Sequence, residues 1–301
     1  MKSERSEAPI PAGDAAPARE SPAPGLYLVA TPIGHARDIT LRALDLLGGA
    51  DLLAAEDTRT TRRLLEIHGL RREPRSILPY HDHNGAAQRP RLLAALAEGR
   101  SVALVSDAGT PLLADPGYRL AAEAIAAGHA VTAVPGASAL LAGLAVAGLP
   151  TDRFLFAGFL PPRAAARRRA LAELAAVPST LVFYESPRRL AEALAAMAET
   201  LGAGRQASVS RELTKRFEET RRGRLGDLAA AYADSGPPKG EIVVVVGPPV
   251  AEAPEEAAVD AALLAALGRA SLKDAVAEVA DALGLPRREV YGRALALTRA
   301  R

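Results

Sequence analysis

Residues 102–111 of the chain read VALVSDAGTP, a short apolar run followed at once by small, turn-forming residues. Residues 130–139, AVTAVPGASA, have the same form. Each apolar run predicts a β-strand, and the small residues leave the backbone accessible just beyond it. Open α/β sheets bind their ligands at the carboxyl ends of their strands. The two stretches therefore predict an α/β fold with a ligand pocket at that edge of a sheet.

The surrounding sequence continues this alternation of strands and helices. Strand-like runs at residues 25–30 and 51–55, with helix-like segments after each, predict a parallel or mostly parallel sheet. We expect Asp38 to cap the first helix, and Asp115 to cap the helix that follows residue 111. Beyond a short linker, further strand-like and helix-like segments predict a second α/β unit.

Composition shifts divide the chain into segments. Its first residues are rich in Ala, Pro, Ser, Glu and Arg and have almost nothing to bury, whereas its last part predicts three short helices. Ser271 and Asp274 resemble a capping box at the second of these helices. The expected segments are a disordered tail at 1–24, an N-terminal α/β domain at 25–150, a C-terminal α/β domain at 151–248 and a three-helix, helix-turn-helix-like extension at 255–301. The outline of this extension is shared by nucleic-acid-binding domains and by plain helical hairpins, and both interpretations stay open.

The composition excludes several kinds of site. The chain contains no cysteine, which rules out disulfides, thiolate zinc sites and a cysteine nucleophile, and fits a reducing cytoplasm. No apolar run approaches the ~18 residues of a membrane span, so we expect no membrane partner. The formal net charge is only +2, so total charge does not indicate a nucleic-acid partner.

Familiar catalytic fingerprints are also missing. The sequence has no phosphate-binding G-x-x-x-x-G-K-[ST] loop, no G-x-G-x-x-G after the first strand and no G-x-S-x-G elbow. These absences argue against a kinase, an ordinary dinucleotide enzyme and an α/β-hydrolase. His81, Asp82 and His83 form an H-x-H group that lacks further ligands at a suitable spacing, so we expect a polar loop and no metal.

Charged residues gather at the ends of predicted strands. Glu56 and Asp57 directly follow the strand at 51–55, where Asp57 could equally cap the next helix. Glu185 ends a strand in the second unit, and residues 211–212 and 239–241 repeat the combination of an acid and a base. Such groups suit acid–base chemistry, although each alone is a weak indication.

Eight short motifs occur in order along residues 25–247. They are ATPIG at 30–34, AEDTR at 55–59, HDHN at 81–84, SDAGTP at 106–111, DPG at 115–117, FYES at 183–186, ELTK at 212–215 and KGE at 239–241. Together with the helical extension, they make the chain resemble the bacterial ribosomal RNA small-subunit methyltransferase I family of the tetrapyrrole-methylase superfamily. Two positions depart from the family pattern, with His35 in place of Asn and Ala137 in place of Pro. Neither departure removes a charge, so we expect activity to be retained.

The resemblance implies a fold, an activity and partners. It implies two α/β domains of the tetrapyrrole-methylase type with S-adenosylmethionine bound between them. The implied activity is 2′-O-methylation of a cytidine in the decoding region of 16S rRNA, with the rRNA or the 30S subunit as substrate. A homodimer in the cytoplasm is also implied.

The resemblance places the cofactor loop at residues 106–111 and a Pro-Gly-x-Ser segment at 135–139. The cofactor-binding residues that we expect are Ser106, Asp107, Ala108, Gly109, Pro111, Leu112, Ser138, Ala139 and Tyr184. A ribose hydroxyl is a poor nucleophile at neutral pH, so a base or an alkoxide-stabilising cation should assist it. The catalytic candidates are Glu56, Glu185 and Lys239. Arg167 to Arg169 and the C-terminal helices are expected to contact RNA phosphates.

Two other functions remain open at this stage. A tetrapyrrole methylase would use the same cofactor site for a small-molecule substrate, but it would not need an arginine-containing helical extension. A non-catalytic RNA-binding module would not need the dense cofactor motifs. The fold itself supports many chemistries, so the substrate is implied by the resemblance alone.

Overall fold

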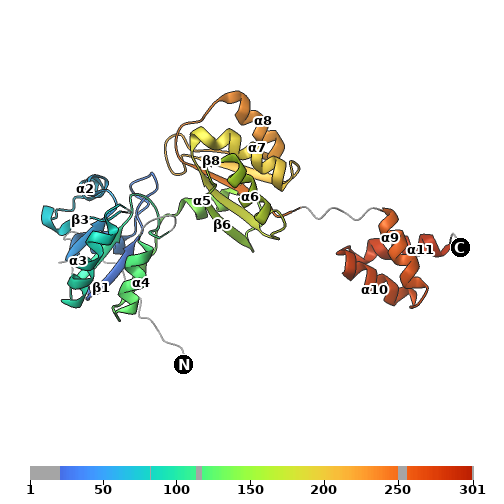
Figure 1. Cartoon of the computed structure of the whole chain (residues 1–301), viewed down its shortest axis with the longest axis horizontal. Coiled ribbons are helices and arrows are strands. Elements are labelled where there is room, and N and C mark those ends of the chain that lie inside the picture. Colours follow the sequence, from blue (N-terminus) through green and yellow to red (C-terminus); the bar gives the residue numbers. More distant parts are fainter. Residues whose placement is uncertain (1–20, 82, 113–116, 250–255, 300–301) are drawn as a thin grey trace, which may run out of the picture. The chain divides into compact units, whose positions relative to one another are not determined.

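The computed structural model describes residues 21–81, 83–112, 117–249 and 256–299 (Figure 1). The chain divides into two compact units, Met1–Pro249 and Val250–Arg301, and each is described by itself. The tail predicted at 1–24 lies outside the described residues except for its last four positions.

The first sheet of the larger unit is entirely parallel. Its strand order is β3-β2-β4-β1-β5. The strands are β1 Gly25–Val29, β2 Leu52–Ala55, β3 Ile77–Pro79, β4 Ser101–Val105 and β5 Val131–Val134. The strands predicted at 102–105 and 130–134 are therefore confirmed, and they flank β1 on its two sides.

Helices cover both faces of this sheet. Helices α1 and α2 pack on one face, whereas α3 and α4 pack on the other. Their bounds are α1 Leu41–Gly49, α2 Thr58–Ile67, α3 Gly85–Ala97 and α4 Tyr118–Ala126. Because both faces are buried, β4 is buried along its whole length, which explains its unbroken apolar sequence.

The strand ends create a crevice at one edge of the sheet. Val29 of β1 is level with Val105 of β4 and with Val134 of β5, so all three strands end together. The helix after β1 lies on one face and the helix after β4 on the other. Neighbouring strands whose connections leave in opposite directions form a topological switch point, which is where such sheets bind ligands.

Helix capping corrects one sequence prediction and leaves another undecided. Thr40, not Asp38, caps α1, because the Thr40 hydroxyl accepts a hydrogen bond from the backbone N–H of Ala43 at 3.1 Å. Asp38 lies in the preceding turn, where its N–H donates to His35. Asp115 lies outside the described residues.

The second sheet is mixed, with the order β6-β7-β10-β8-β9. Its strands are β6 Phe154–Phe159, β7 Thr180–Glu185, β8 Gln206–Arg211, β9 Glu219–Arg224 and β10 Ile242–Val246. Only β6 and β7 pair in parallel, whereas the other three pairings are antiparallel. The prediction of a parallel or mostly parallel sheet, made for the first α/β unit, is thus confirmed there, whereas the sheet of the second unit is mixed. The sequence of β9, ETRRGR, is polar and has no strand-like apolar pattern, although β9 is an edge strand that pairs antiparallel with β8.

Helices from two parts of the chain cover the second sheet. The helices α6 Ala164–Leu174, α7 Leu190–Leu201 and α8 Leu225–Ser235 pack on one face (Figure 1). Helix α5, Ala139–Ala147, packs on the other face against Val182, Val243 and Val245. The residues that follow β5 of the first sheet therefore form part of the core of the second.

The arginines of α6 differ in exposure. Arg167 is only 4% exposed and pairs with Glu192 at 3.1 Å. The expectation that Arg167 contacts RNA is therefore wrong, because its side chain lies on the same helix face as buried Leu171. Arg168 and Arg169 are exposed.

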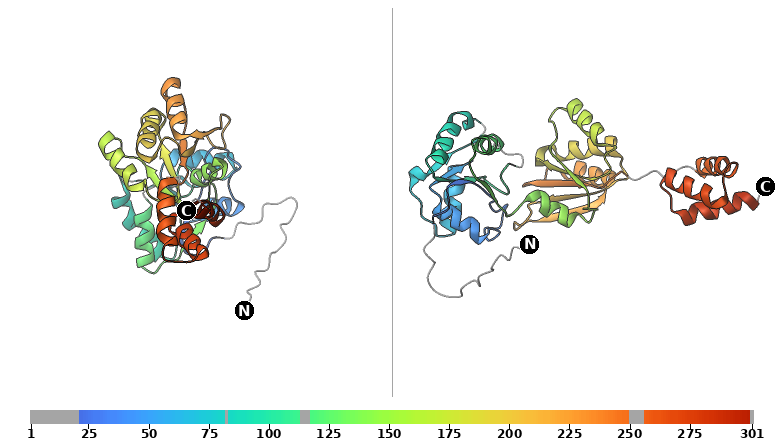
Figure 2. Two further views of the ribbon diagram at one scale, coloured as in Figure 1. Left: turned by 90° about the vertical axis from the view of Figure 1, so that its right-hand side faces the viewer. Right: turned by 90° about the horizontal axis from the view of Figure 1, so that it is seen from below.

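The smaller unit is a three-helix cluster (Figure 2). Its helices are α9 Glu256–Leu267, α10 Leu272–Leu283 and α11 Arg287–Arg299. The predicted cap of α10 is confirmed, since Ser271 accepts a hydrogen bond from the N–H of Asp274 at 3.3 Å. Within the described residues, no helix combines the length and the apolar character needed to cross a membrane.

Candidate functional site

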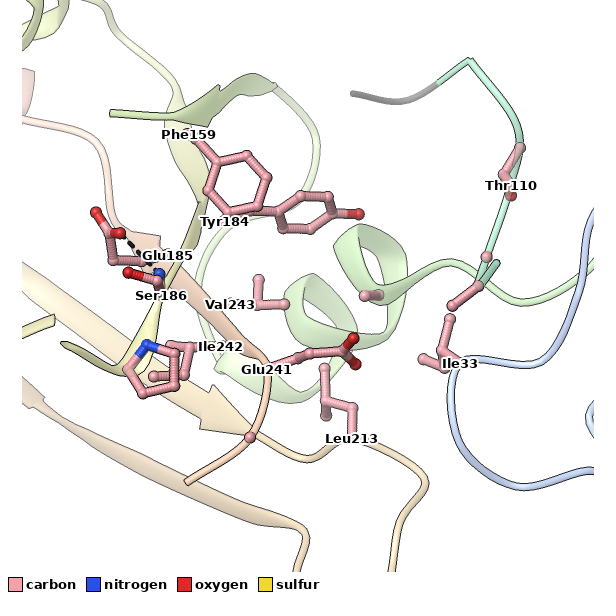
Figure 3. A pocket seen from close by; sticks show the side chains of 15 residues that line it. Ile33, Thr110, Phe159, Tyr184, Glu185, Ser186, Leu213, Glu241, Ile242 and Val243 are labelled. Atoms are coloured by element: carbon pink, nitrogen blue, oxygen red, sulfur yellow. Dashed lines mark hydrogen bonds between the residues drawn. The ribbon is translucent and has the colours of Figure 1, made fainter. Parts of the chain in front are cut away.

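A cavity of about 380 Å³ lies at the crevice formed by the strand ends of the first sheet. We call it the main cavity. Its volume falls within the range of small-molecule sites, ~300–1,000 Å³. Its lining comes from the loops after β1 and β4, from α5 and from the second sheet (Figure 3). The lining residues are Ile33, Ala108, Gly109, Thr110, Ala139, Phe159, Tyr184, Glu185, Ser186, Pro187, Leu213, Gly240, Glu241, Ile242 and Val243.

The loop after β4 is held by its neighbours. Thr31 and Gly109 exchange two backbone hydrogen bonds, at 2.9 and 3.0 Å. Ser106 donates its hydroxyl to the carbonyl of Gly109, and Thr110 donates to Ala137 in the loop after β5. Gly109 has a φ of 81°, which only glycine adopts without strain. The backbone at the cavity is thus fixed to the loops of both neighbouring strands.

Aromatic side chains form another part of the wall. The Tyr184 hydroxyl accepts a hydrogen bond from the N–H of Leu140, in the first turn of α5, at 3.2 Å. Burial raises the pKa of Tyr184, so it stays protonated. Phe159, which is 55% exposed, meets the Tyr184 ring edge-on with centroids 5.7 Å apart (Figure 3). Ser138 lies beside the Tyr184 hydroxyl. Although Ser138 precedes α5, its side chain forms no capping hydrogen bond with that helix. A flat aromatic ligand would fit such a wall.

Glu185 is a buried carboxyl group at the main cavity, only 3% exposed. One of its oxygens, Oε1, accepts a hydrogen bond from the N–H of Ser186 and forms an ion pair with the guanidinium of Arg189, both at 2.7 Å. Within the described residues, its Oε2 has no hydrogen-bond partner. This oxygen remains available as an acceptor for a bound group.

A second hollow, of about 260 Å³, shares Ile33, Ala108 and Glu241 with the main cavity. We call it the side hollow. Ser106 and Asp107 also line it. The side hollow and the main cavity therefore meet at the loops after β1 and β4.

Acidic residues organise the backbone beside the side hollow. The N–H of Asp107 donates to Glu56 Oε2 at 3.2 Å, and the N–H of Asp57 donates to Asp107 Oδ1 at 3.0 Å. Burial and the charge of Asp57 raise the pKa of Asp107. Asp57 itself caps α2, and hydrogen bonds from Arg59 lower its pKa to about 2. The capping role considered for Asp57 is thus confirmed.

An ionic cluster lies where the two spaces meet. Lys215 Nζ donates to Glu212 Oε1 and to Glu241 Oε2, both at 2.9 Å. Burial alone would lower the pKa of Lys215, but these two bonds outweigh it and raise that pKa, while the bond from Lys215 lowers the pKa of Glu212. The ELTK motif at 212–215 was one of the eight motifs noted in the sequence, but no function was predicted for its lysine. Its proximity to the KGE motif appears only in three dimensions.

The loop that carries this cluster is tightly constrained. Glu212 and Thr214 have positive φ angles of 51° and 65°, which are uncommon for residues other than glycine. The N–H of His35 donates to Thr214 Oγ1 at 3.0 Å, so the loop also contacts the segment after β1. Gly240, at φ 99°, leaves space that a Cβ atom would take from the Glu212 carboxyl group. Residues far apart in sequence are therefore fixed together beside the main cavity.

The predicted site residues fall into three groups. Ala108, Gly109, Ala139, Tyr184 and Glu185 line the main cavity, and Ser106, Asp107 and Ala108 line the side hollow. The remaining predicted residues line neither space, and they are Pro111, Leu112, Ser138, Glu56 and Lys239. Leu112 packs instead against the core beneath α3 and α4, and Lys239 lines a separate hollow. Their roles stay predictions.

Some lining residues were not anticipated from the sequence. Ile33, Phe159, Leu213, Glu241 and Val243 are among them. Ile33, Leu213 and Glu241 belong to the ATPIG, ELTK and KGE motifs, whereas Phe159 and Val243 lie in none of the eight motifs. In the described part of the chain, no group of three or more His, Asp or Glu side chains could hold a metal ion, and Asp82 lies outside that part.

Comparisons with known proteins give this architecture a class. Residues 25–229 match the family described as Tetrapyrrole (Corrin/Porphyrin) Methylases, and residues 253–298 match the RsmI C-terminal HTH domain. The fold also resembles that of diphthine synthase, with a TM-score of 0.57 at 19% identity over 74% of this chain and 89% of that one. A uroporphyrin III C-methyl transferase from Thermus thermophilus, solved with S-adenyl homocysteine, matches with a TM-score of 0.50 at 22% identity over 74% of this chain and 97% of that one. Fold and site therefore define a methyltransferase.

A closer relative narrows the class. The chain is 54% identical to the ribosomal RNA small subunit methyltransferase I of Mesorhizobium japonicum over 274 residues, which cover 91% of this chain and 92% of that protein. The chain belongs to the ribosomal RNA small subunit methyltransferase I family, within the tetrapyrrole methylases.

Proposed function

We propose that this protein transfers a methyl group from S-adenosylmethionine to the 2′-hydroxyl of a cytidine in the decoding region of 16S rRNA. The observation that carries the proposal is the 54% identity to a ribosomal RNA small subunit methyltransferase I across nine-tenths of both chains. This identity is accompanied by the C-terminal HTH domain match. A small-molecule tetrapyrrole methylase is the second candidate, and the solved methylases that favour it share less than 25% identity.

The main cavity supports the proposed cofactor. Its aromatic wall of Tyr184 and Phe159 suits an adenine ring, and the backbone at Ala108 and Gly109 offers polar groups to the methionine end. When bound, S-adenosylmethionine supplies an electrophilic methyl group on a sulfonium. The apolar residues around it exclude water, which would otherwise compete for this group. The Glu185 Oε2 atom, unpartnered within the described residues, can accept a hydrogen bond inside the cavity.

The wider set of cofactor residues belongs to the same proposal. It comprises Ser106, Asp107, Ala108, Gly109, Pro111, Leu112, Ser138, Ala139 and Tyr184. Asp107 is the sharpest test, because its carboxylate holds the loop after β2 beside the side hollow. Asp107→Ala removes the charged acceptor of the hydrogen bond from the N–H of Asp57, so the loop after β2 is no longer held beside the side hollow. We therefore expect this variant to bind S-adenosylmethionine about tenfold or more weakly in calorimetry. The exposed Asp152→Ala is the matched control, and equal affinity of the two variants would contradict the role of Asp107.

The hydroxyl to be methylated must lose its proton, and the side hollow provides groups for that step. Glu241 lines both spaces and its carboxylate is 73% exposed, so a substrate can reach it. Lys215, held by Glu212 and Glu241, offers a positive charge that would stabilise a developing alkoxide. Among the earlier catalytic candidates, Glu185 lines the main cavity. Glu56 holds the Asp107 backbone through a hydrogen bond.

The activity can be tested directly. Purified protein is incubated with methyl-labelled S-adenosylmethionine and with small ribosomal subunits that lack the modification, large subunits or uroporphyrinogen. We expect label only in 16S rRNA, in a dinucleotide that resists alkaline hydrolysis because its 2′-hydroxyl is blocked. Label on a base or on the tetrapyrrole would refute the proposal. A lack of labelling with all three would favour a non-catalytic RNA-binding module.

The assembly and location form part of the same proposal. We infer a homodimer that works in the cytoplasm, with residues 25–150, 151–248 and 255–301 as its domains. Support for self-association comes from α4, on which Tyr118 and Ile125 are 70% and 62% exposed and share one helix face. Sedimentation at several concentrations measures the mass, and a strictly monomeric protein would contradict the dimer.

A further inference from the structure

A third hollow, of about 450 Å³, lies on the second sheet beside the segment that lines the main cavity. We call it the basic hollow. Arg211 of β8, Arg221 of β9, Phe217 and Lys239 line it. Lys239 is followed directly by Gly240 and Glu241, which line the main cavity. One short segment therefore borders the basic hollow at one residue and the main cavity at the next two.

The basic hollow carries an excess of positive charge. Glu219 accepts hydrogen bonds from Arg211 Nε at 2.6 Å and from Arg221 Nε at 2.8 Å. Both guanidinium groups keep further N–H donors, because each has five. Lys239 is exposed and forms no ion pair with any residue that the structure describes. Three cations, Arg211, Arg221 and Lys239, thus line the hollow with two carboxylates, Glu219 and Glu212. Glu212 is also paired with Lys215, which leaves the hollow with an excess of positive charge.

An aromatic ring stands at the same hollow. Phe217 is 63% exposed, and the Arg216 guanidinium lies 5.5 Å from its ring centroid. Beneath, Arg221 lies 5.3 Å from the buried ring of Tyr232, which keeps that guanidinium in place. An exposed phenyl ring stacks on any nucleobase, and adjacent arginine and lysine side chains bind the phosphates that join them.

This combination selects one kind of ligand. A free anion would use the cations but not the ring. Double-stranded RNA presents phosphates while its bases stay stacked inside, so it would also leave the ring unused. An unpaired nucleotide in a single strand presents a base face and a phosphate together.

We propose that the basic hollow binds an unpaired nucleotide of the RNA substrate, with Phe217 stacking on its base and Lys239, Arg211 and Arg221 contacting phosphate. The proposal rests on the proposed function in supposing an RNA substrate. It gives Lys239 a binding role in place of the catalytic one suggested by the sequence. Since Lys239 adjoins Gly240 and Glu241, this nucleotide lies close along the strand to the one whose hydroxyl reaches Glu241.

The test measures binding of the full-length protein to a fluorescein-labelled single-stranded oligocytidylate over a range of salt concentrations. Phe217→Leu keeps an apolar side chain but loses the ring, and we expect it to weaken binding roughly 5- to 100-fold. Phe217→Tyr keeps the ring and should bind like the wild type. Lys239→Gln should reduce the slope of log affinity against log salt by about 0.7, the value for one lost phosphate contact on a single strand. Arg91→Gln removes an exposed charge from α3 and should leave the slope unchanged.

Several results would overturn the proposal. They are a Phe217→Leu variant that binds as tightly as Phe217→Tyr, an unchanged salt slope for Lys239→Gln, and a wild-type protein that binds no RNA. A change in sedimentation without a change in RNA binding would identify the basic hollow as a protein interface instead. Circular dichroism and S-adenosylmethionine binding confirm that each variant is folded.

The methylation assay separates this proposal from the proposed function. If the wild type labels 16S rRNA and the variants match it in KM for subunits and in salt slope, only the basic hollow fails. If the wild type labels no rRNA, the proposed function fails, while the oligocytidylate data still decide whether the basic hollow binds RNA.

Discussion

Replacing Lys215 by methionine removes the ammonium group shared by two carboxylates beside the main cavity. The bond to Glu212 is mostly shielded, since the two side chains are 29% and 19% exposed, whereas Glu241 is 73% exposed. A shielded hydrogen bond between charged groups contributes about 1.5–3 kcal/mol, and an exposed ion pair about 0–1 kcal/mol. We therefore expect Lys215→Met to reduce the free energy of unfolding by about 2 kcal/mol at neutral pH.

The loss should depend on pH with a definite sign. The pKa of Glu212 is lowered from 4.5 in the folded protein, so its contribution is present above pH 4.5 and is lost as the pH falls through the lowered folded value. The pKa of Lys215 is raised from 10.5, so its contribution is present below pH 10.5 and is lost as the pH rises through the raised folded value. The difference in stability between wild type and Lys215→Met should be largest between these limits.

Chemical denaturation of the full chain, followed by circular dichroism at a series of pH values, measures this difference. The matched control is Lys273→Met, which removes an exposed lysine of α10 and should change stability by less than about 0.5 kcal/mol. A difference for Lys215→Met that stays constant from neutral to acid pH would refute the reasoning. So would a neutral-pH difference no larger than that of the control.

Three further predictions concern the same site and its RNA. Tyr184→Phe removes the acceptor of a backbone N–H in the first turn of α5, and denaturation should show a loss of about 1–3 kcal/mol, whereas an unchanged midpoint would speak against that bond. Gly240→Ala should lose at least about 1–3 kcal/mol to backbone strain and displace the Glu212 carboxyl group, lowering S-adenosylmethionine affinity in calorimetry. Gly204→Ala, where a Cβ meets nothing within 4 Å, is its control, and equal effects of the two would contradict the argument. Deleting residues 255–301 should weaken binding to small subunits and flatten its salt dependence, and an unchanged slope in filter binding would exclude phosphate contacts by the C-terminal helices.

The sequence predicted the elements that are determined locally. The runs that become β4 and β5 are short, apolar and bounded by turn residues, so both the strands and the loops after them could be identified. Ser271 could be assigned as a cap because a cap depends on residues within one helical turn. Five of the predicted site residues line the main cavity because they lie at such strand ends.

Features that depend on distant parts of the chain could not be predicted in this way. The polar strand β9 has no apolar pattern, since it lies at the edge of its sheet and owes its pairing to β8. Arg167 belongs to a run of arginines that suggests a solvated face, yet it is buried because it shares a helix face with Leu171. Thr40 caps α1, and the predicted cap Asp38 does not, because the N–H of Asp38 is hydrogen-bonded to His35 in the preceding turn.

In the KGE segment at 239–241, the backbone conformation of Gly240 places the lysine and the glutamate at different spaces. In an extended strand, residues two apart share a face, so Lys239 and Glu241 would be expected on one side. Gly240 has a φ of 99° and breaks this alternation, so Lys239 lines the basic hollow while Glu241 lines the main cavity. A side chain at Gly240 would also overlap the Glu212 carboxyl group that Lys215 binds. Gly240 therefore leaves room for the Glu212 carboxyl group of the ionic cluster, and its backbone conformation directs Lys239 and Glu241 to different spaces. For this reason, the lysine and the glutamate of one motif are better assigned to separate steps, RNA binding and the handling of the hydroxyl proton, than to one shared catalytic group.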